Sequence, residues 1–284
     1  MTSSAPPLDI EHLRNWIDRE ETAVDRVSEE LARKFQATLE LPGEPPREGL
    51  VVPRFVHFCL TQALTPTSGL GEDGHPRRGG YLPPLPLPRR MWAGGELSFN
   101  GDLRVGDVVR RVSRIADVKA KEGRSGSLCF VTVKHELDVD GQVVVKERQD
   151  IVYRGSDSGG TKKETVAAAA GKHVRRVEPS PPFLFRYSAV TFNAHRIHYD
   201  HPYATKVEGY PGLVVHGPLQ ATLLFNFAAE IQGTPPSRFS FKSLSPLFDN
   251  ADFFLHAERD DSGLKLWTAR KDGPVAMEAE AKWA

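Results

Sequence analysis

Cysteine is scarce in this chain of 284 residues: only Cys59 and Cys129 occur, and they lie in two dissimilar segments. Two such residues provide neither a disulfide framework nor the paired spacing of a zinc site. We therefore expect no bound metal. A chain with so little cysteine is also typical of a protein in a reducing cytoplasm.

Net charge is absent too, because lysine plus arginine and aspartate plus glutamate each number 37. No global field attracts nucleic acid or an anionic membrane, so an acidic ligand must meet a local cluster of cations. No segment approaches the roughly 20 apolar residues of a membrane span, and the start, MTSSAPPLDIEHLRNW, has no apolar targeting segment. We expect a soluble, unprocessed, cytoplasmic protein that binds neither nucleic acid nor membrane.

The apolar content of the chain, 39% of its residues, is sufficient for a sizeable core, and the length favours two domains over one. Residues 9–39 have apolar positions at helical spacing and predict helical structure, with Ser28 as an N-cap before Glu29 and Glu30. Prolines between Pro42 and Pro46 end this helical region.

Residues 64–90 are rich in glycine and proline and cannot form a regular element. They form either a long ordered flap over a substrate or a mobile loop. The basic part, YLPPLPLPRR, also has the composition of an SH3 ligand, although its position inside a domain favours a flap or a dimer contact. From Gly94 the apolar and polar residues alternate, which predicts long antiparallel strands with a turn at Asp140-Gly141.

Residues 155–180 lack aromatic residues and carry glycine, serine and lysine, so they predict a linker, with a short helix around Glu164 to Ala170. The linker separates an N-terminal domain, 1–154, from a C-terminal domain, 181–284. In the latter we expect a helix from Gly217 to about Ile231, followed by four strands. This helix is apolar almost all round, so a sheet must wrap it. The predicted fold is α+β, a double hot-dog in which each unit wraps a long helix in a curved antiparallel sheet.

The chemistry of the chain concentrates in residues 186–219, which contain N-x-H-x-x-H-x-D and then H-G-P. His198 is a candidate general base, and Asn193 is able to orient a water molecule but not to accept its proton. Gly217 is expected in the first turn of the helix, where its free N–H suits a developing negative charge. A base and an oxyanion donor are the parts that water addition beside a carbonyl requires.

The same residues resemble the MaoC-like, R-specific enoyl-CoA hydratase family, whose pattern places a histidine at His198 and a glycine at Gly217. The chain departs from that pattern at Asn193, where the family has a catalytic aspartate, and at His195-Arg196, where it has Asn-Pro. In this it is similar to the branch of mitochondrial 3-hydroxyacyl-thioester dehydratases and of mesaconyl-CoA and itaconyl-CoA hydratases. WAGGELSFNGDLRVGDVV extends the resemblance to the first half. The resemblance implies a hydro-lyase that acts on an acyl-CoA substrate without a cofactor, and we expect a homodimer.

Four further loop residues are candidate substrate contacts: His195, Arg196, Asp200 and His216. Arg196 is either a cation for a substrate carboxylate or phosphate, or a brace for the loop. Asp200 either caps the turn HPYA or replaces the missing acid, and His216 supports the loop by hydrogen bonds. The first half has no histidine after its expected helix, so it is predicted to be a degenerate unit that covers the tunnel. We expect His57 and His75 to be structural.

Three functions fit these residues. The first is hydration of a short enoyl-CoA, above all a dicarboxylic one such as itaconyl-CoA or mesaconyl-CoA, to citramalyl-CoA. The second is dehydration of longer 3-hydroxyacyl-thioesters on CoA or acyl carrier protein, favoured by a tunnel lined by Phe183, Phe185, Leu224 and Phe227. The third is a hot-dog thioesterase or a non-catalytic acyl-binding module, since a fold alone does not define a function.

Overall fold

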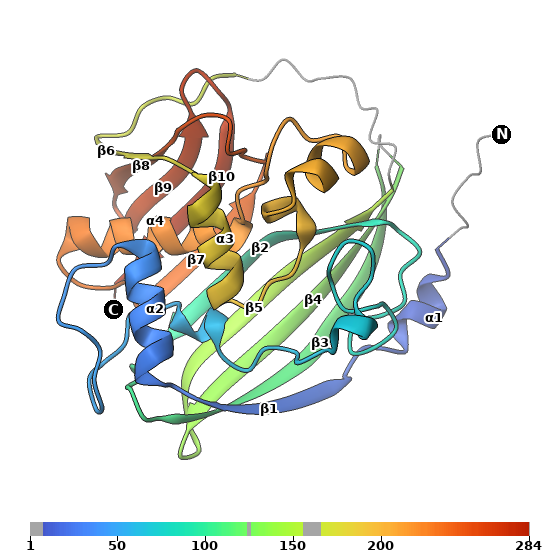
Figure 1. Cartoon of the computed structure of the whole chain (residues 1–284), viewed down its shortest axis with the longest axis horizontal. Helices are drawn as coiled ribbons and strands as arrows, with labels where there is room; N and C mark the ends of the chain where they lie inside the picture. The colour runs from blue at the N-terminus through green and yellow to red at the C-terminus, as the bar shows by residue number, and fades with distance from the viewer. Residues whose placement is uncertain (1–7, 124–125, 156–165, 284) are drawn as a thin grey trace.

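A single antiparallel sheet of ten strands organises the molecule, as seen in a computed structural model that describes residues 8–123, 126–155 and 166–283. The strand order is β1-β3-β4-β5-β2-β7-β10-β9-β8-β6, so the two halves of the chain join where β2 pairs with β7 (Figure 1). The strands are β1 Glu20–Arg26, β2 Arg89–Phe99, β3 Val108–Gly123, β4 Gly126–Val139, β5 Gln142–Arg154, β6 His173–Val177, β7 Arg238–Ser243, β8 Phe253–Asp260, β9 Gly263–Arg270 and β10 Val275–Lys282.

Helices cover one side of this sheet. The helix α4, Gly217–Gln232, packs against β7 to β10, and α2 lies beside α3 in front of the sheet (Figure 1). The remaining helical segments are α1 Ile10–Arg14, α2 Glu29–Leu39, α3 Pro181–Val190 and the short turns η1 Val56–Cys59, η2 Thr67–Gly69, η3 Arg196–His198 and η4 Tyr203–Val207. Within the described residues, no helix combines the length and the apolarity needed to cross a membrane.

The prediction of continuous helical structure over residues 9–39 is partly wrong. Two helices, α1 and α2, are present, but the segment between them is the strand β1, which pairs with β3 over its whole length. Exposed and partly buried residues alternate along the first half of β1. Asp18, with a φ of 67°, forms the turn before the strand. Ser28 is the predicted N-cap of α2, because its side-chain oxygen accepts a hydrogen bond of 3.1 Å from the Leu31 N–H.

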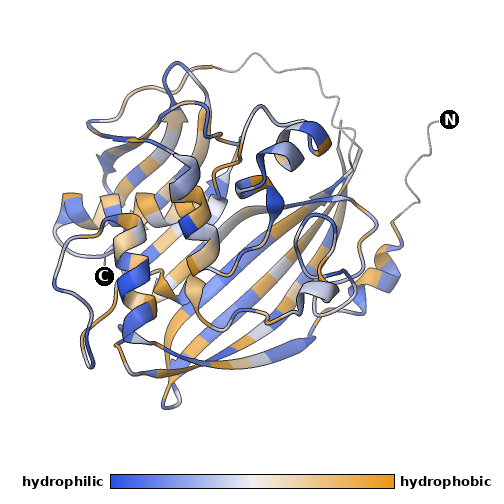
Figure 2. Cartoon of the chain, viewed as in Figure 1, coloured by the Kyte–Doolittle hydropathy of each residue, from blue (hydrophilic) through white to orange (hydrophobic). Residues whose placement is uncertain are grey.

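The long strands β3 to β5 confirm the predicted meander, and apolar and polar side chains alternate along them (Figure 2). Asp140 and Gly141, with φ values of 50° and 80°, form the tight turn between β4 and β5. Both residues need the left-handed region there, which matches the preference of a two-residue hairpin for Asp-Gly.

The expected linker, 155–180, contains a strand. Residues of β6 pair with β8 at the edge of the sheet. Of the short helix expected in this range, Glu164 lies outside the described residues, and 166–170 are not helical. The division into 1–154 and 181–284 stays a prediction.

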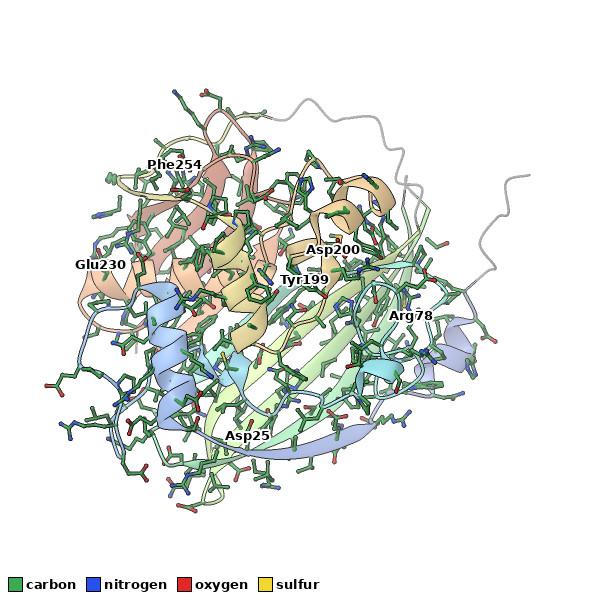
Figure 3. All side chains as sticks on the ribbon, in the orientation of Figure 1. Asp25, Arg78, Tyr199, Asp200, Glu230 and Phe254 are labelled. Atoms are coloured by element: carbon green, nitrogen blue, oxygen red, sulfur yellow. The ribbon has the colours of Figure 1, made fainter. Side chains whose placement is uncertain are left out.

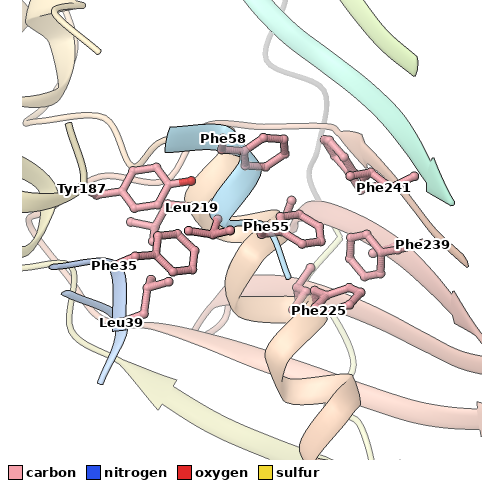
Figure 4. Close-up of a cluster of buried hydrophobic side chains, with 14 of the residues drawn as sticks. Phe35, Leu39, Phe55, Phe58, Tyr187, Leu219, Phe225, Phe239 and Phe241 are labelled. Atoms are coloured by element: carbon pink, nitrogen blue, oxygen red, sulfur yellow. The ribbon is translucent and has the colours of Figure 1, made fainter. Parts of the chain in front are cut away.

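The main core joins the two halves of the chain (Figure 4). Phe55, in the first half, packs 4.7 Å from Phe225 of α4 and 5.7 Å from Phe239 of β7, measured between ring centroids. The helix α4 confirms the prediction of a buried helix from Gly217 and ends at Gly233, which has a φ of 82°. The helix of the first half, α2, has only 11 residues against 16 in α4. It packs against α3 and η1.

The glycine- and proline-rich segment is an ordered flap, the first of its two interpretations. We call residues 64–88 the flap. The Trp16 indole N–H donates a hydrogen bond to the Gly80 carbonyl, which attaches the flap to the segment after α1. Within the flap, Arg78 donates a hydrogen bond to the Leu85 carbonyl. In Figure 1 it lies in front of β3 to β5.

Candidate active site

The loop between α3 and α4 carries the predicted catalytic residues, and its own polar groups shape it. Phe192, with a φ of 51°, turns the chain out of α3, and the Asn193 N–H donates to the Ser188 carbonyl over 2.8 Å. The Asn193 side-chain oxygen accepts the His195 N–H over 3.0 Å. Asp200 accepts the Tyr203 N–H over 3.1 Å, which confirms the cap predicted for the turn HPYA.

His198 is buried, with 7% of its surface exposed, and it is oriented by one strong hydrogen bond. Its Nδ1 donates to the Val214 carbonyl over 2.7 Å, so the ring proton is on Nδ1 and Nε2 keeps a lone pair. Burial lowers the pKa of His198 to about 4, against the opposing effect of the Val214 carbonyl. The side chain is therefore neutral at pH 7 and is able to accept a proton.

His216 supports His198 from behind. The two rings stack with centroids 3.7 Å apart, and the Nε2 of His216 hydrogen-bonds the Ser188 hydroxyl over 2.8 Å. Burial holds the pKa of His216 well below its usual range, and the nearby His198 lowers it further. His216 is fully buried and does not line the cavity, so its prediction as a substrate contact is wrong, whereas its role in supporting the loop agrees with the structure.

Gly217 begins α4 directly after His216, and no side chain caps this end of the helix. Its N–H is therefore one of the first-turn donors that lack an intrahelical partner, and the helix dipole favours negative charge there. The carbonyl that holds His198 belongs to Val214, three residues before Gly217, and the His198 ring stacks on His216, the residue directly before Gly217. These links place the imidazole and the amide at the same wall.

A cavity of about 1080 Å³ lies over this wall, and both halves of the chain line it. Three predicted catalytic residues, Asn193, His198 and Gly217, are among its lining residues, as is His195. From the first half come residues of β2, β3, β4 and β5 and of the flap. The first half thus covers the site, as predicted for a degenerate unit.

Arg196 and Asp200 form a pair outside the lining of the cavity, so the structure does not place these two predicted substrate contacts beside His198. Two nitrogens of Arg196 contact one Asp200 oxygen, at 2.9 and 2.8 Å, and a third donates to the Glu72 carbonyl over 3.0 Å. The guanidinium also lies 4.1 Å from the ring centroid of Tyr203. Figure 3 shows Asp200 on this loop. The arginine braces the loop and joins it to the flap, because its donors are already engaged.

The flap brings a histidine and a carboxylate to the site. His75 and Asp73 are joined by a side-chain hydrogen bond of 2.9 Å, and the His75 ring lies 4.1 Å from that of His195. Burial lowers the pKa of His75 to about 4, so the ring is neutral at pH 7. His75 was expected to be structural, but it lines the cavity.

Gly74 allows this close approach of the flap. It has a φ of 87°, and a Cβ there would lie 1.8 Å from the Ala194 carbonyl oxygen. The atoms of Asp73, His75 and His195 that are able to bind a metal lie within 4.8 Å of one another. Asp73 and His75 are, however, already bonded to each other, which explains their proximity without an ion.

The inner end of the cavity contains buried polar side chains of the first half. Burial lowers the pKa of His57 and of His135 to about 3 and raises the pKa of Glu147 to about 7, so both histidines are neutral at pH 7. The Nε2 atoms of His57 and His135 have no hydrogen-bond partner in the part of the chain that the structure describes. His57, like His75, lines the cavity.

Comparisons with known proteins agree with this geometry. A family model described as hydroxyacyl-thioester dehydratase type 2 matches residues 55–249. A mesaconyl-C(4)-CoA hydratase of Chloroflexus aurantiacus is 43% identical over 266 residues, which cover 93% of this chain and 95% of that protein. A mitochondrial hydroxyacyl-thioester dehydratase type 2 of Schizosaccharomyces pombe is 30% identical over 68% of this chain and 73% of its own length.

The chain belongs to the hydroxyacyl-thioester dehydratase type 2 family. It is a hydro-lyase, and the predicted resemblance to mesaconyl-CoA hydratases and mitochondrial 3-hydroxyacyl-thioester dehydratases is confirmed.

Solved structures confirm the fold. A protein of Mycobacterium tuberculosis described as a double hot-dog superposes with a TM-score of 0.54 at 12% identity, over 94% of this chain and 96% of that one. A MaoC-like dehydratase gives a TM-score of 0.70 at 13% identity, over 96% of this chain and 100% of that one. The α+β double hot-dog is therefore the fold of this family member.

Several residues of the dehydratase site escaped the sequence prediction. Ser188 and Val214 orient the two histidines, while Arg78 and Arg90 line the cavity from the flap and from β2. Arg90 ends the basic segment YLPPLPLPRR and Arg78 lies just before it, but nothing in the sequence indicated which wall either arginine faces.

Proposed function

We propose that this protein adds water reversibly to the double bond of a short enoyl-CoA, with a dicarboxylic acyl group as the preferred substrate. The observation that carries the proposal is the neutral, buried His198, fixed by Val214 at the start of α4. The products are then 3-hydroxyacyl-CoA thioesters, of the citramalyl-CoA type when the substrate is mesaconyl-CoA linked through C4; itaconyl-CoA, whose double bond is not conjugated with the thioester, does not fit this reaction.

In the proposed reaction, the Nε2 of His198 accepts a proton from water while the water oxygen bonds to the β-carbon. The electron pair of the double bond moves onto the thioester carbonyl, and the Gly217 N–H stabilises the resulting enolate oxygen. The imidazolium of His198 then returns the proton to the α-carbon, so one water molecule is added and the base is regenerated. Asn193 orients the water, since its oxygen is bonded to the His195 N–H and its NH₂ group remains for this task.

The dicarboxylic substrate is supported by the relative from Chloroflexus aurantiacus, whose name specifies mesaconyl-C(4)-CoA. It is supported independently by the charges at the cavity, which are taken up in the next section. The predicted cation for the substrate carboxylate, Arg196, does not contribute, because Asp200 already neutralises it.

Dehydration of longer 3-hydroxyacyl-thioesters is the second candidate. It is favoured by the volume of the cavity, which extends into the first half, and by the relative from Schizosaccharomyces pombe. The predicted tunnel does not support it: Phe185 lines the cavity, whereas Phe183, Leu224 and Phe227 do not.

The proposal is tested with His198→Ala and crotonyl-CoA, by following the loss of the conjugated enoyl absorbance. A positioned base contributes roughly 10²- to 10⁴-fold, so we expect a loss of that size in kcat/KM. Asn193→Ala, which removes only orientation, loses less. His201→Ala is a matched control, because His201 is an exposed histidine of the same loop and does not line the cavity.

Near-wild-type turnover in a folded His198→Ala protein contradicts the mechanism. The products separate hydration from hydrolysis: release of free CoA indicates a thioesterase, whereas loss of the enoyl absorbance with an intact thioester indicates a hydratase. A protein that binds acyl-CoA without either change is a binding module.

We also propose a cytoplasmic homodimer that uses no cofactor besides its CoA-thioester substrate. The reaction as written supports the last point, because it needs neither an electron carrier nor a Lewis acid. Light scattering of the purified protein measures its mass in solution, and a monomer contradicts the homodimer.

A further inference from the structure

Positive charge gathers around the cavity although the chain as a whole is neutral. Among the described residues that line it are two glutamates, Glu21 and Glu147, and five arginines: Arg77, Arg78, Arg90, Arg111 and Arg154. Burial also raises the pKa of Glu147 to about 7, so this acid carries only part of its charge at neutral pH. The cavity is therefore suited to an anionic ligand.

Among the arginines of the cavity, Arg90 is the one whose charge acts on both His75 and His195. It lies on β2 opposite Tyr153 of β5 and lines the cavity, whereas its neighbour Arg89 is paired with Glu208 at 3.6 Å and does not. After burial, the charge of Arg90 is among the causes that lower the pKa values of His75 and His195. Its guanidinium thus acts directly on the rings beside His198.

No carboxylate lies within ion-pairing distance of Arg90 in the described part of the chain. Asp73 feels its charge, but the hydrogen bonds of Asp73 are made to His75. A half-buried guanidinium without an ion pair is costly to desolvate, so a site of this kind is well matched to an incoming anion.

Arg78, on the flap, adds a second positive charge to the lining of the cavity. Its guanidinium donates to two backbone carbonyls, those of Leu85 at 2.6 Å and Pro88 at 2.7 Å, and it lies 6.0 Å from the ring centroid of Tyr153. Carbonyl partners fix its position without neutralising its charge. In Figure 3, Arg78 lies on the flap in front of the long strands.

By contrast, Arg111 at the inner end is 3.9 Å from Glu21 and also interacts with Glu147. It already has acidic partners. Arg77 and Arg154 also line the cavity without an ion pair among the described residues, and the Arg154 Nε is buried without a hydrogen-bond partner. Arg90 and Arg78 differ from these two because their charges act on the histidines of the site: after burial, Arg90 lowers the pKa values of His75 and His195, and Arg78 lowers that of His75.

We propose that Arg90, backed by Arg78 and Tyr153, is the receptor for the free carboxylate of a dicarboxylic acyl group. The assignment rests on the proposed hydratase function and specifies its substrate class. The planar guanidinium binds a carboxylate by two parallel hydrogen bonds, which orients the acyl group as well as attracting it. The double bond is then presented to His198.

The carboxylate receptor also explains how the site distinguishes dicarboxylic from monocarboxylic acyl groups. A monocarboxylic acyl group such as crotonyl brings no anion, so Arg90 stays without an ion pair when that substrate enters. A site built to bond a polar substrate group disfavours the analogue that lacks the group.

The test compares Arg90→Gln with the wild-type protein on two substrates, mesaconyl-CoA linked through C4 and crotonyl-CoA. Losing one partner of a desolvated charge pair predicts a fall of about 30- to 1000-fold in kcat/KM for mesaconyl-CoA. For crotonyl-CoA, which has no carboxylate to lose, we expect a smaller fall, so the ratio of kcat/KM for mesaconyl-CoA to that for crotonyl-CoA should drop at least about tenfold. Circular dichroism and the urea midpoint show that the variant is folded. Arg90→Lys keeps the charge without the fork and should lie between wild type and Arg90→Gln on mesaconyl-CoA.

Arg148→Gln is the matched control. Arg148 is on β5, it pairs with Glu96 and Asp150, and it does not line the cavity, unlike its neighbours Glu147 and Gln149. It should leave the ratio of the two substrates unchanged.

Three outcomes overturn different statements. Equal losses on mesaconyl-CoA and crotonyl-CoA in Arg90→Gln refute the receptor while the hydratase function stands. A wild-type protein that hydrates crotonyl-CoA but no dicarboxylic enoyl-CoA refutes the proposed substrate class, and a wild-type protein that hydrates neither refutes the proposed reaction.

Discussion

Gly74→Ala is expected to separate the flap from the histidine loop while leaving the fold intact. A methyl group at this position would lie 1.8 Å from the Ala194 carbonyl oxygen and 2.8 Å from its carbon. Ordinary contacts between such atoms are about 3.5 Å, so the flap or the loop must retreat by roughly 1.5 Å. Both clashing atoms belong to the backbone, and no side-chain rotation relieves them.

A displacement of this size moves His75 away from His195 and shifts the loop that carries His198. Misplacing a reactive group by about 1 Å costs on the order of 100-fold in rate, so we expect kcat/KM for hydration to fall by about that factor. An alanine in the left-handed region also costs roughly 1–2 kcal/mol of stability. The assay is the loss of enoyl absorbance, with urea unfolding to measure stability.

Gly79→Ala is the control for backbone strain. Gly79 has the same φ, 87°, but the nearest atom to its added Cβ is 3.7 Å away, on Pro84. It should therefore lose a similar amount of stability without the 100-fold loss of activity. Equal kcat/KM values for Gly74→Ala and Gly79→Ala would refute the reasoning.

Three further results are expected. Because His198 must be neutral to act as a base and its pKa is lowered to about 4, kcat/KM should be constant near neutral pH and fall with one proton below about pH 5; a fall already centred at pH 6.5 would contradict this. Arg196→Ala should lower crotonyl-CoA and mesaconyl-CoA hydration by the same factor, since Arg196 braces the loop, and a selective loss on mesaconyl-CoA would restore it as a carboxylate contact. The neutral form of His57 is favoured in the folded state, with a pKa of about 3 against about 6.5 when unfolded, so its contribution to stability is complete above pH 6.5 and is lost as the pH falls toward 3. At pH 5.5 the loss in unfolding free energy is about 1.4 kcal/mol relative to neutral pH. The urea midpoint of His57→Leu should therefore fall less between pH 7.5 and 5.5 than that of the wild type.

Local sequence was sufficient for the features that depend on neighbouring residues. Ser28 caps α2, Asp140-Gly141 forms a hairpin turn, and α4 begins at Gly217 and is mostly buried between Leu219 and Ala228. Each follows from residues within one turn or one helix length. The spacing of the histidine loop also identified His198 and Asn193, which the structure places at one cavity.

The error at residues 20–26 has a different origin. The segment follows a short helix and precedes α2, and its apolar residues are compatible with a continued helix. It is a strand because β3, almost 90 residues later, presents a free edge that pairs with it. Pairing across such a distance cannot be read from a local pattern.

The amino-acid sequence by itself determined the family, the double hot-dog fold and the residues of the histidine loop, because these are written in contiguous motifs. Only the tertiary structure decided which charges and rings meet. In the folded chain Arg196 bonds Asp200, and His216 stacks on His198. His75 and Arg90, from the first half, line the cavity. The physical reason is that a side chain's role depends on what the folded backbone places beside it, and the strands and the flap here join residues more than one hundred positions apart.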